Sequence, residues 1–249
     1  MNHGHSPAPA DALRLRASSL DKVFVLHHQH GAQLPVFAGL HLQVAAGECV
    51  ALTGPSGCGK STLMRCLYGN YAPSGGRVEV LHQGQWLDLH RAAPRQVIAA
   101  RRHSLGHVTQ FLRAIPRVPT LDLVAEPLCR LGVDETRARE QARALLDRLN
   151  VPQRLWSLPP ATFSGGEQQR VNVARGFIAA QPVLLLDEPT ASLDERNRQV
   201  VVDLILQARA RGAALVGIFH DAEVRQAVST RSFELGAAKS PTFRSPAHV

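Results

Sequence analysis

Residues 54–62 of this chain read Gly54-Pro55-Ser56-Gly57-Cys58-Gly59-Lys60-Ser61-Thr62. The stretch fits the P-loop pattern G-x-x-x-x-G-K-S/T at every position. The apolar run 49–52 before it predicts a strand buried on both faces, and the apolar residues of 63–67 follow at helical spacing. A chance match in a glycine-rich turn is the alternative, but a strand, a glycine loop and a helix in this order hold a phosphate chain. We therefore expect this chain to bind a nucleoside triphosphate, with Lys60 on its β- and γ-phosphates and the Ser61 hydroxyl on Mg²⁺.

Length, charge and cysteine content limit the classes of fold and function that this chain can belong to. The 249 residues allow one large α/β domain, or a core with an inserted subdomain. The net charge of +8 permits contact with nucleic acid, acidic lipid or an acidic protein, and a solvated arginine-rich surface is the simplest interpretation. Four cysteines without C-x-x-C spacing predict neither a disulfide framework nor a thiolate metal site. Since no apolar run has the length of a membrane span and the polar start is no signal peptide, we expect a soluble, cytoplasmic protein.

Patterns upstream of the P-loop and directly after it predict strands. Residues 13–26 and 36–44 read as strands, with a loop or hairpin between them. Residues 77–89 read as a hairpin with its turn near Gln83 and Gly84.

The amino-acid composition and the hydrophobic pattern differ between residues 111 and 162 from those of the rest of the chain. Arginine and alanine dominate there, and the helical pattern is strong over 135–149. This predicts a helical subdomain inserted into one domain that covers residues 12–230. The two ends, 1–11 and 231–249, are expected to be disordered.

Polar side chains stand where the expected parallel strands end. The run 183–186 ends in Asp187 and Glu188, the run 213–219 ends in His220, and the strand 105–109 leads to Gln110. Open parallel sheets bind ligands at the carboxyl ends of their strands, so we expect these side chains to converge with the P-loop on one catalytic centre.

Each of these side chains suits one task in nucleotide hydrolysis. Asp187 is the expected Mg²⁺ ligand alongside Ser61, and Glu188 is placed to orient and deprotonate the attacking water. Two adjacent carboxylates at the end of a buried strand are costly without a cation, which argues against a purely structural role. Gln110 can contact the metal or the water, and His220 can donate a hydrogen bond to the γ-phosphate and hold Glu188 in place.

A further helix is expected to begin after Ser164 and to run to about residue 180. Ser164 with Glu167 three residues later is a capping box, and Gly165 and Gly166 leave the helix N-terminus open to an anion. A cap alone would not need two glycines and the Gln-Gln-Arg that follows. This helix start is therefore a candidate anion-binding position.

Taken together, the motifs resemble those of the ATP-binding cassette (ABC) ATPases over nearly the whole chain. In that family they correspond to Walker A (Gly54 to Thr62), the Q-loop (Gln110), the signature (Ser164 to Gln168, after Phe163 where leucine is usual), Walker B (Val183 to Glu188), the D-loop (Ser192 to Asp194) and the switch histidine (His220).

This resemblance implies an α/β P-loop NTPase with an ABC-type mixed or parallel sheet core, an N-terminal antiparallel β subdomain and an inserted helical subdomain. It implies ATP and Mg²⁺ as cofactors, and a head-to-tail dimer, with a second copy or with another ABC subunit. Each ATP would lie between Walker A of one subunit and the signature of the other, contacted by Ser164, Gly165 and Gly166. The resemblance also places Asp194 and Phe24 among the nucleotide-binding residues. Phe24 would stack on adenine, and a core phenylalanine is the alternative.

Five segments further resemble the L-type ATPase (PhnL) of the bacterial carbon–phosphorus lyase system for phosphonate use. They are 24–35, 110–117, 149–156, 163–177 and 217–221. This resemblance implies soluble lyase subunits as partners and support for a reaction in which a phosphonate displaces adenine from ATP to give a ribose 1-phosphonate 5-triphosphate.

Two alternatives stand beside that assignment. One is the ATP-binding subunit of a transporter of the lipoprotein- or peptide-exporter type, because the Q-loop region can equally dock a coupling helix. The other is a nucleic-acid-linked ABC ATPase, which only the basic charge suggests and for which the helical insertion is too short.

Overall fold

The computed structural model describes residues 12–26, 31–112 and 116–236. Short 3₁₀ turns cover Gln153–Leu155 and Pro160–Thr162. The strands and the α-helices are, in chain order, β1 (Leu13–Leu26), β2 (Ala32–Ala45), β3 (Cys49–Thr53), α1 (Lys60–Leu67), β4 (Gly75–His82), β5 (Gln85–Asp88), α2 (Pro94–His103), β6 (Leu105–Val108), α3 (Thr120–Arg130), α4 (Glu135–Arg148), α5 (Gly165–Phe177), β7 (Val183–Asp187), α6 (Glu195–Ala210), β8 (Ala214–Ile218), α7 (Ala222–Val228) and β9 (Arg231–Glu234).

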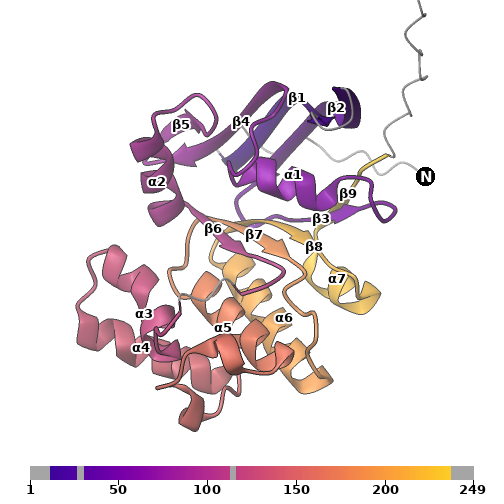
Figure 1. The fold of residues 1–249 in the computed structure, drawn as a ribbon. Helices are drawn as coiled ribbons and strands as arrows, with labels where there is room; N and C mark the ends of the chain where they lie inside the picture. Colours follow the sequence, from indigo (N-terminus) through magenta and orange to yellow (C-terminus); the bar gives the residue numbers. More distant parts are fainter. Residues whose placement is uncertain (1–11, 27–30, 113–115, 237–249) are drawn as a thin grey trace, which may run out of the picture.

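Two sheets organise these elements (Figure 1). The first is antiparallel in the order β2-β1-β4-β5, and the second runs β6-β7-β8-β3-β9 with every pairing parallel. Helix α1 lies between the two sheets, while α5 and α6 cover the opposite face of the parallel sheet. The predicted α/β fold with an antiparallel N-terminal subdomain is therefore confirmed.

The hairpin between β4 and β5 turns where the sequence predicts. Gln83 and Gly84 have φ values of 50° and 79°, as the two central residues of a type I′ turn require. His82 pairs with Gln85 directly across this turn, which sets the register of the hairpin.

Alternating side chains of the parallel strands pack into two separate hydrophobic cores, one on each face of the sheet. In β7, Val183 and Leu185 pack with the apolar cluster under α1 and the antiparallel sheet. Leu184 and Leu186 pack on the opposite face, with α5, α6 and the helices of the insertion. A strand buried on both faces has no polar position until it ends, and so the first carboxylate, Asp187, stands at its tip.

The described residues of the expected helical insertion form α3, α4 and the two 3₁₀ turns, without a strand among them. The side chain of Asp134 caps α4 by accepting from the N–H groups of Thr136 and Arg137. Both helices pack beside α5 on one side of the molecule (Figure 1). None of the helices in the described ranges has the length and hydropathy of a membrane span.

The C-terminal boundary differs from the sequence-based expectation. Arg231–Glu234 form β9, which pairs in parallel with β3, and Leu235 donates its N–H to the Thr53 carbonyl. The expectation of a disordered tail from residue 231 is therefore wrong for these residues, because a short, polar strand at the sheet edge has little apolar pattern of its own. The expectations for 1–11 and for 237–249 lie outside the described residues.

Candidate functional site

Three glycines shape the P-loop between β3 and α1. Gly54, Gly57 and Gly59 have φ values of 134°, 78° and 102°, a region that favours glycine. Gly59 also has no room for a side chain, since a Cβ there would lie 2.4 Å from Cγ1 of Val36. The loop is thus held open by backbone conformations and close approaches that other residues would disturb.

Lys60 folds its side chain back over this loop. Its Nζ donates to the carbonyls of Gly54 and Pro55 at 2.9 Å each and lies 3.8 Å from Sγ of Cys58. A cavity of about 550 Å³ adjoins the loop, and its lining includes Ser61, Glu188, His220 and Arg225. The predicted phosphate-binding residues and two of the predicted catalytic residues therefore face one space.

Asp187 is a buried carboxylate with one unpaired oxygen, as expected of a cation ligand. It is buried, and its Oδ1 has no hydrogen-bond partner among the described residues. Burial and the neighbouring Glu188 raise the pKa of Asp187 to about 6, because both oppose its negative charge. Asp187 lines a second cavity together with Ser61 and Gln110. Oxygen donors from a hydroxyl, a carboxylate and an amide fit Mg²⁺.

Glu188 is held in place through both carboxylate oxygens. Its Oε1 lies 2.7 Å from Nε2 of His220, and its Oε2 accepts from Nε2 of Gln110 at 3.4 Å. The backbone of Glu188 has φ = 55°, which is uncommon for a residue with a side chain and is a form of strain found at active sites. The three side chains that the sequence assigned to catalysis thus meet, although β6, β7 and β8 deliver them separately.

Two buried residues of α5 support this centre and were not predicted. Gln169 donates its side-chain amide to the carbonyls of Glu188 and Pro189, at 3.2 and 3.1 Å. Asn172 donates to the carbonyl of Thr109, next to Gln110, at 2.5 Å. The signal was present in the sequence as polar residues on the inner face of a helix that also carries buried valines, but their partners are distant in sequence.

Arg225 is a third residue that sequence reasoning missed. It stands on α7, one turn after the helix starts, and it lines the P-loop cavity beside His220. Its guanidinium adds positive charge to a cavity that Lys60 also lines.

The signature segment forms its predicted capping box but lies away from both cavities. Oγ of Ser164 accepts from the N–H of Glu167 at 3.3 Å, and the Glu167 carboxylate accepts from the N–H of Ser164 at 2.9 Å. The hydrogen bonds from Ser164 lower the pKa of Glu167. Neither residue lines the P-loop cavity or the cavity at Asp187, and the same holds for Gly165 and Gly166.

Asp194 acts in this chain as a helix cap. Its carboxylate accepts from the backbone N–H and from the side-chain amide of Asn197, both at 2.8 Å. The structure therefore places Asp194 at the start of α6 rather than in either of these cavities.

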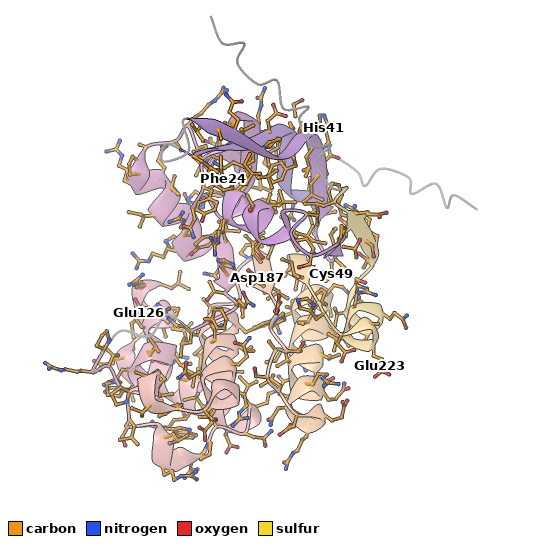
Figure 2. All side chains as sticks on the ribbon, turned by 45° about the vertical axis from the view of Figure 1, so that its right-hand side comes forward. Phe24, His41, Cys49, Glu126, Asp187 and Glu223 are labelled. Atoms are coloured by element: carbon orange, nitrogen blue, oxygen red, sulfur yellow. The ribbon has the colours of Figure 1, made fainter. Side chains whose placement is uncertain are left out.

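Phe24 packs against an aromatic neighbour and does not face the P-loop cavity. Its ring lies edge-on to that of Tyr71, with 5.7 Å between ring centroids, and Nζ of Lys22 lies 4.6 Å from its centroid. Phe24 does not line the cavity at the P-loop. In Figure 2, Phe24 lies within the upper part of the molecule and Asp187 near the middle.

Comparison with known proteins gives a family match. The family model described as "ABC transporter" matches residues 37–191, which is more than half of the chain. The chain is 37% identical over 219 residues to the lipoprotein-releasing system ATP-binding protein LolD of Xanthomonas campestris, and the match covers 88% of each protein. It is 34% identical over 231 residues to an uncharacterized ABC transporter ATP-binding protein of Mycobacterium tuberculosis, covering 93% of this chain and 68% of the relative.

Solved structures give the same result for the fold. A dimeric post-hydrolysis state of the ATP-binding cassette MJ0796, bound to ADP and Pi, superposes with a TM-score of 0.79 at 26% identity. That match covers 90% of this chain and 94% of the other. The chain is therefore a member of the ABC transporter family of ATP-binding cassettes.

Proposed function

We propose that this chain hydrolyses ATP with the help of Mg²⁺ at the P-loop centre. The observation that carries this proposal is the meeting of Glu188, His220 and Gln110 at the cavity walls that the P-loop also forms. The loop N–H groups and Lys60 would bind the β- and γ-phosphates, and Lys60 would exchange its present carbonyl partners for phosphate oxygens.

Ser61, Asp187 and Gln110 would hold Mg²⁺, which when bound neutralises charge on the β- and γ-phosphate oxygens. The free Oδ1 of buried Asp187 supports this assignment, because an uncompensated carboxylate there is costly without a cation.

Glu188 would accept a proton from the attacking water. Its hydrogen bonds with His220 and Gln110 restrict the carboxylate to one orientation beside the cavity. His220, whose side chain is 74% exposed, can also reach a γ-phosphate in the same cavity.

We further propose that a second ABC subunit, either another copy of this chain or a different cassette, completes the site head to tail. Ser164 and its glycines lie at a helix N-terminus, which suits an anion, yet they do not line the cavity of their own chain. A partner whose signature faces this P-loop would bring the two together. The dimeric solved relative supports this arrangement.

For the coupled partner, similarity favours a transporter of the lipoprotein-release type. Several relatives, at 35–38% identity, are the ATP-binding proteins LolD of lipoprotein-releasing systems. The chain would then bind a membrane permease through its Q-loop region and couple ATP hydrolysis to the work of that permease.

A subunit of the carbon–phosphorus lyase system is a second candidate. It rests on the segments resembling PhnL, above all Gly217-Ile218-Phe219-His220-Asp221, where many transporter ATPases have threonine before the histidine. Under this assignment the partners are soluble lyase subunits, and the chain supports ribosyl triphosphate formation from ATP and a phosphonate.

The test of hydrolysis is the Glu188→Gln variant. We expect it to bind ATP and to lose turnover by about 100-fold or more, because the amide cannot accept the water proton. Glu223→Gln, at an exposed position on α7, is the matched control and should keep turnover. Near-normal hydrolysis in Glu188→Gln would refute the assignment of the base.

Co-purification from cells grown on a phosphonate as the only phosphorus source tests the partner. Recovery of a membrane permease supports the transporter assignment, and recovery of soluble lyase subunits supports the second candidate.

A further inference from the structure

Gly217 lies in the middle of the parallel sheet and has no side chain of its own. In β8 it pairs with Ala51 of β3 on one side and with Leu186 of β7 on the other. The ring of Phe219 occupies the space that a side chain at Gly217 would fill, since a Cβ there would lie 2.2 Å from Cζ and 2.4 Å from Cε2 of that ring. Residues two apart in a strand point to the same face, and so the ring folds back along its own strand.

The ring of Phe219 is surrounded by other apolar side chains. Phe219 is 4% exposed and belongs to the core on the α5 and α6 side of the sheet, together with Ala51, Leu186 and Leu215. Because protein interiors are close-packed, a rigid ring enclosed in this way has little freedom to shift. We call the ring of Phe219, seated on Gly217, the Phe219 anchor.

The Phe219 anchor lies in sequence between two contacts with Glu188. The carbonyl of Ile218, the residue before it, accepts from the backbone N–H of Glu188 at 3.1 Å. His220, the residue after it, places Nε2 at 2.7 Å from Oε1 of Glu188. The backbone of Phe219 therefore connects the point where Glu188 is bonded to the sheet with the imidazole that holds its carboxylate.

The imidazole of His220 depends on its backbone for its position. Its side chain is 74% exposed, and Glu188 is its one hydrogen-bond partner in the described part of the chain. On the other side, Asp221 is fixed, since it caps α7 and forms an ion pair with Arg198 at 3.0 Å. An exposed ring is not positioned by packing, so its place follows from the backbone that the two neighbouring residues fix.

We propose that Phe219 is a positioning residue for His220, because its ring on Gly217 holds the imidazole within hydrogen-bond distance of Glu188. The inference rests on the proposed function and adds a residue that acts through His220. Phe219 lies in the wall of the P-loop cavity, but its ring is buried and has no polar atom to offer a nucleotide. Displacing a catalytic group by about 1 Å can cost as much as 100-fold in rate, so a small shift of this ring should be measurable.

The experiment exchanges volume between the two positions in the full chain. Gly217→Ala adds a methyl group where the far end of the ring lies, and Phe219→Leu removes the ring atoms Cε1, Cε2 and Cζ. We expect kcat for basal ATP hydrolysis to fall by about tenfold in Gly217→Ala and by about threefold in Phe219→Leu, while KM for ATP changes by less than about twofold. In the double variant the new methyl group replaces the lost ring atoms, so kcat should return to within about twofold of that of the unmodified chain.

Two controls separate positioning from a general loss of packing. Phe177→Leu makes the same change at a phenylalanine of the same core that is 5% exposed and lines neither the P-loop cavity nor the cavity at Asp187. It should lower the melting temperature about as much as Phe219→Leu does and leave kcat unchanged. The second control is the His220→Ala background, in which Gly217→Ala should not lower kcat further, because the side chain through which it acts is gone.

Four outcomes overturn the inference. They are an unchanged kcat in both single variants, an equal loss of kcat in Phe177→Leu, a further loss when Gly217→Ala is added to His220→Ala, and a double variant that is no faster than the slower single variant. If Gly217→Ala does not fold, Phe219→Leu and its comparison with Phe177→Leu still decide between the two explanations.

A readout without hydrolysis separates this inference from the proposed function. In protein that carries ¹⁵N-labelled histidine, the Nε2 signal of His220, identified by its absence in His220→Ala, should shift in Gly217→Ala and stay in place in Phe177→Leu. If the unmodified chain does not hydrolyse ATP, the proposed function fails, and this signal still tests the Phe219 anchor. If the chain hydrolyses ATP but Gly217→Ala changes neither the signal nor kcat, only this inference fails.

Discussion

Nε2 of His220 lies 2.7 Å from Oε1 of Glu188, and this contact joins the ends of two neighbouring parallel strands. Gln110 holds the other carboxylate oxygen from a third strand. The carboxylate is therefore oriented by two side chains, and one of them, His220, is itself exposed to the P-loop cavity.

Replacing His220 should slow hydrolysis more than it weakens nucleotide binding. In His220→Ala, Glu188 loses its shorter hydrogen bond and the γ-phosphate loses a donor, so we expect kcat to fall by about 100-fold while ATP affinity changes little. Steady-state kinetics and a binding titration measure the two effects. His41→Ala, at an exposed position on β2, should leave both unchanged. Equal losses in binding and turnover would show that His220 acts in nucleotide binding instead.

The pKa of Asp187 predicts how metal binding depends on pH. Since burial and Glu188 raise this pKa to about 6, the metal-free carboxyl is protonated below that pH and cannot bind a cation. We expect the apparent Mg²⁺ affinity in the presence of ATP to weaken as the pH falls through about 6. Titrations of Mg²⁺ on either side of this pH check the prediction. An Mg²⁺ affinity that stays constant over this range would contradict it.

The same carboxyl affects the stability of the metal-free protein. Its folded-state pKa lies above the ordinary value of 3.8, so the folded state binds the proton more tightly and the contribution of Asp187 to stability is lost as the pH rises from about 4 to about 6. At neutral pH without metal, Asp187→Asn should therefore raise the free energy of unfolding by on the order of 1 kcal/mol. Added Mg²⁺ with ATP should stabilise the unmodified chain and not this variant. Asp147→Asn, at an exposed position on α4, is the control and should respond to Mg²⁺ as the unmodified chain does.

Gln169 is expected to matter for both stability and turnover. In Gln169→Leu the carbonyls of Glu188 and Pro189 lose their donor, and leaving buried acceptors unpaired costs about 1–3 kcal/mol of unfolding free energy. Since Glu188 sits at a strained φ, loosening its carbonyl should also lower kcat. Denaturant unfolding and ATPase assays measure these effects. Gln199→Leu on the exposed side of α6 should change neither, and a Gln169 variant with unchanged turnover would limit its role to folding.

Arg225 should contribute to nucleotide binding through charge. Removing its guanidinium from the P-loop cavity in Arg225→Ala is expected to raise KM for ATP by roughly fivefold with little change in kcat, as for a charged contact worth about 1 kcal/mol. Arg225→Lys should recover part of the loss because it keeps the positive charge. The neighbouring exposed Gln226→Ala should behave as the unmodified chain. An unchanged KM in Arg225→Ala would remove it from the site.

Local chemistry explains why so much of this protein could be predicted. The P-loop is a pattern of glycines needed for positive φ, the capping box joins Ser164 to a residue three positions away, and the strand before Asp187 is apolar on both faces. Each of these features depends on neighbours in sequence. That is why the α/β fold, the hairpin turn at Gln83 and the positions of Glu188 and His220 followed from the sequence alone.

Contacts between distant segments decided the rest. β9 is a strand because its backbone pairs with that of β3. Gln169 and Asn172 support the catalytic centre because α5 packs beside the ends of strands that are distant from it in sequence. The ring of Phe24 packs edge-on against the ring of Tyr71, and Ser164 lies outside the P-loop cavity of its own chain. Sequence patterns determine which backbone forms and which face is buried, but a hydrogen-bond partner or a shared cavity depends on three-dimensional packing, which only the tertiary structure specifies.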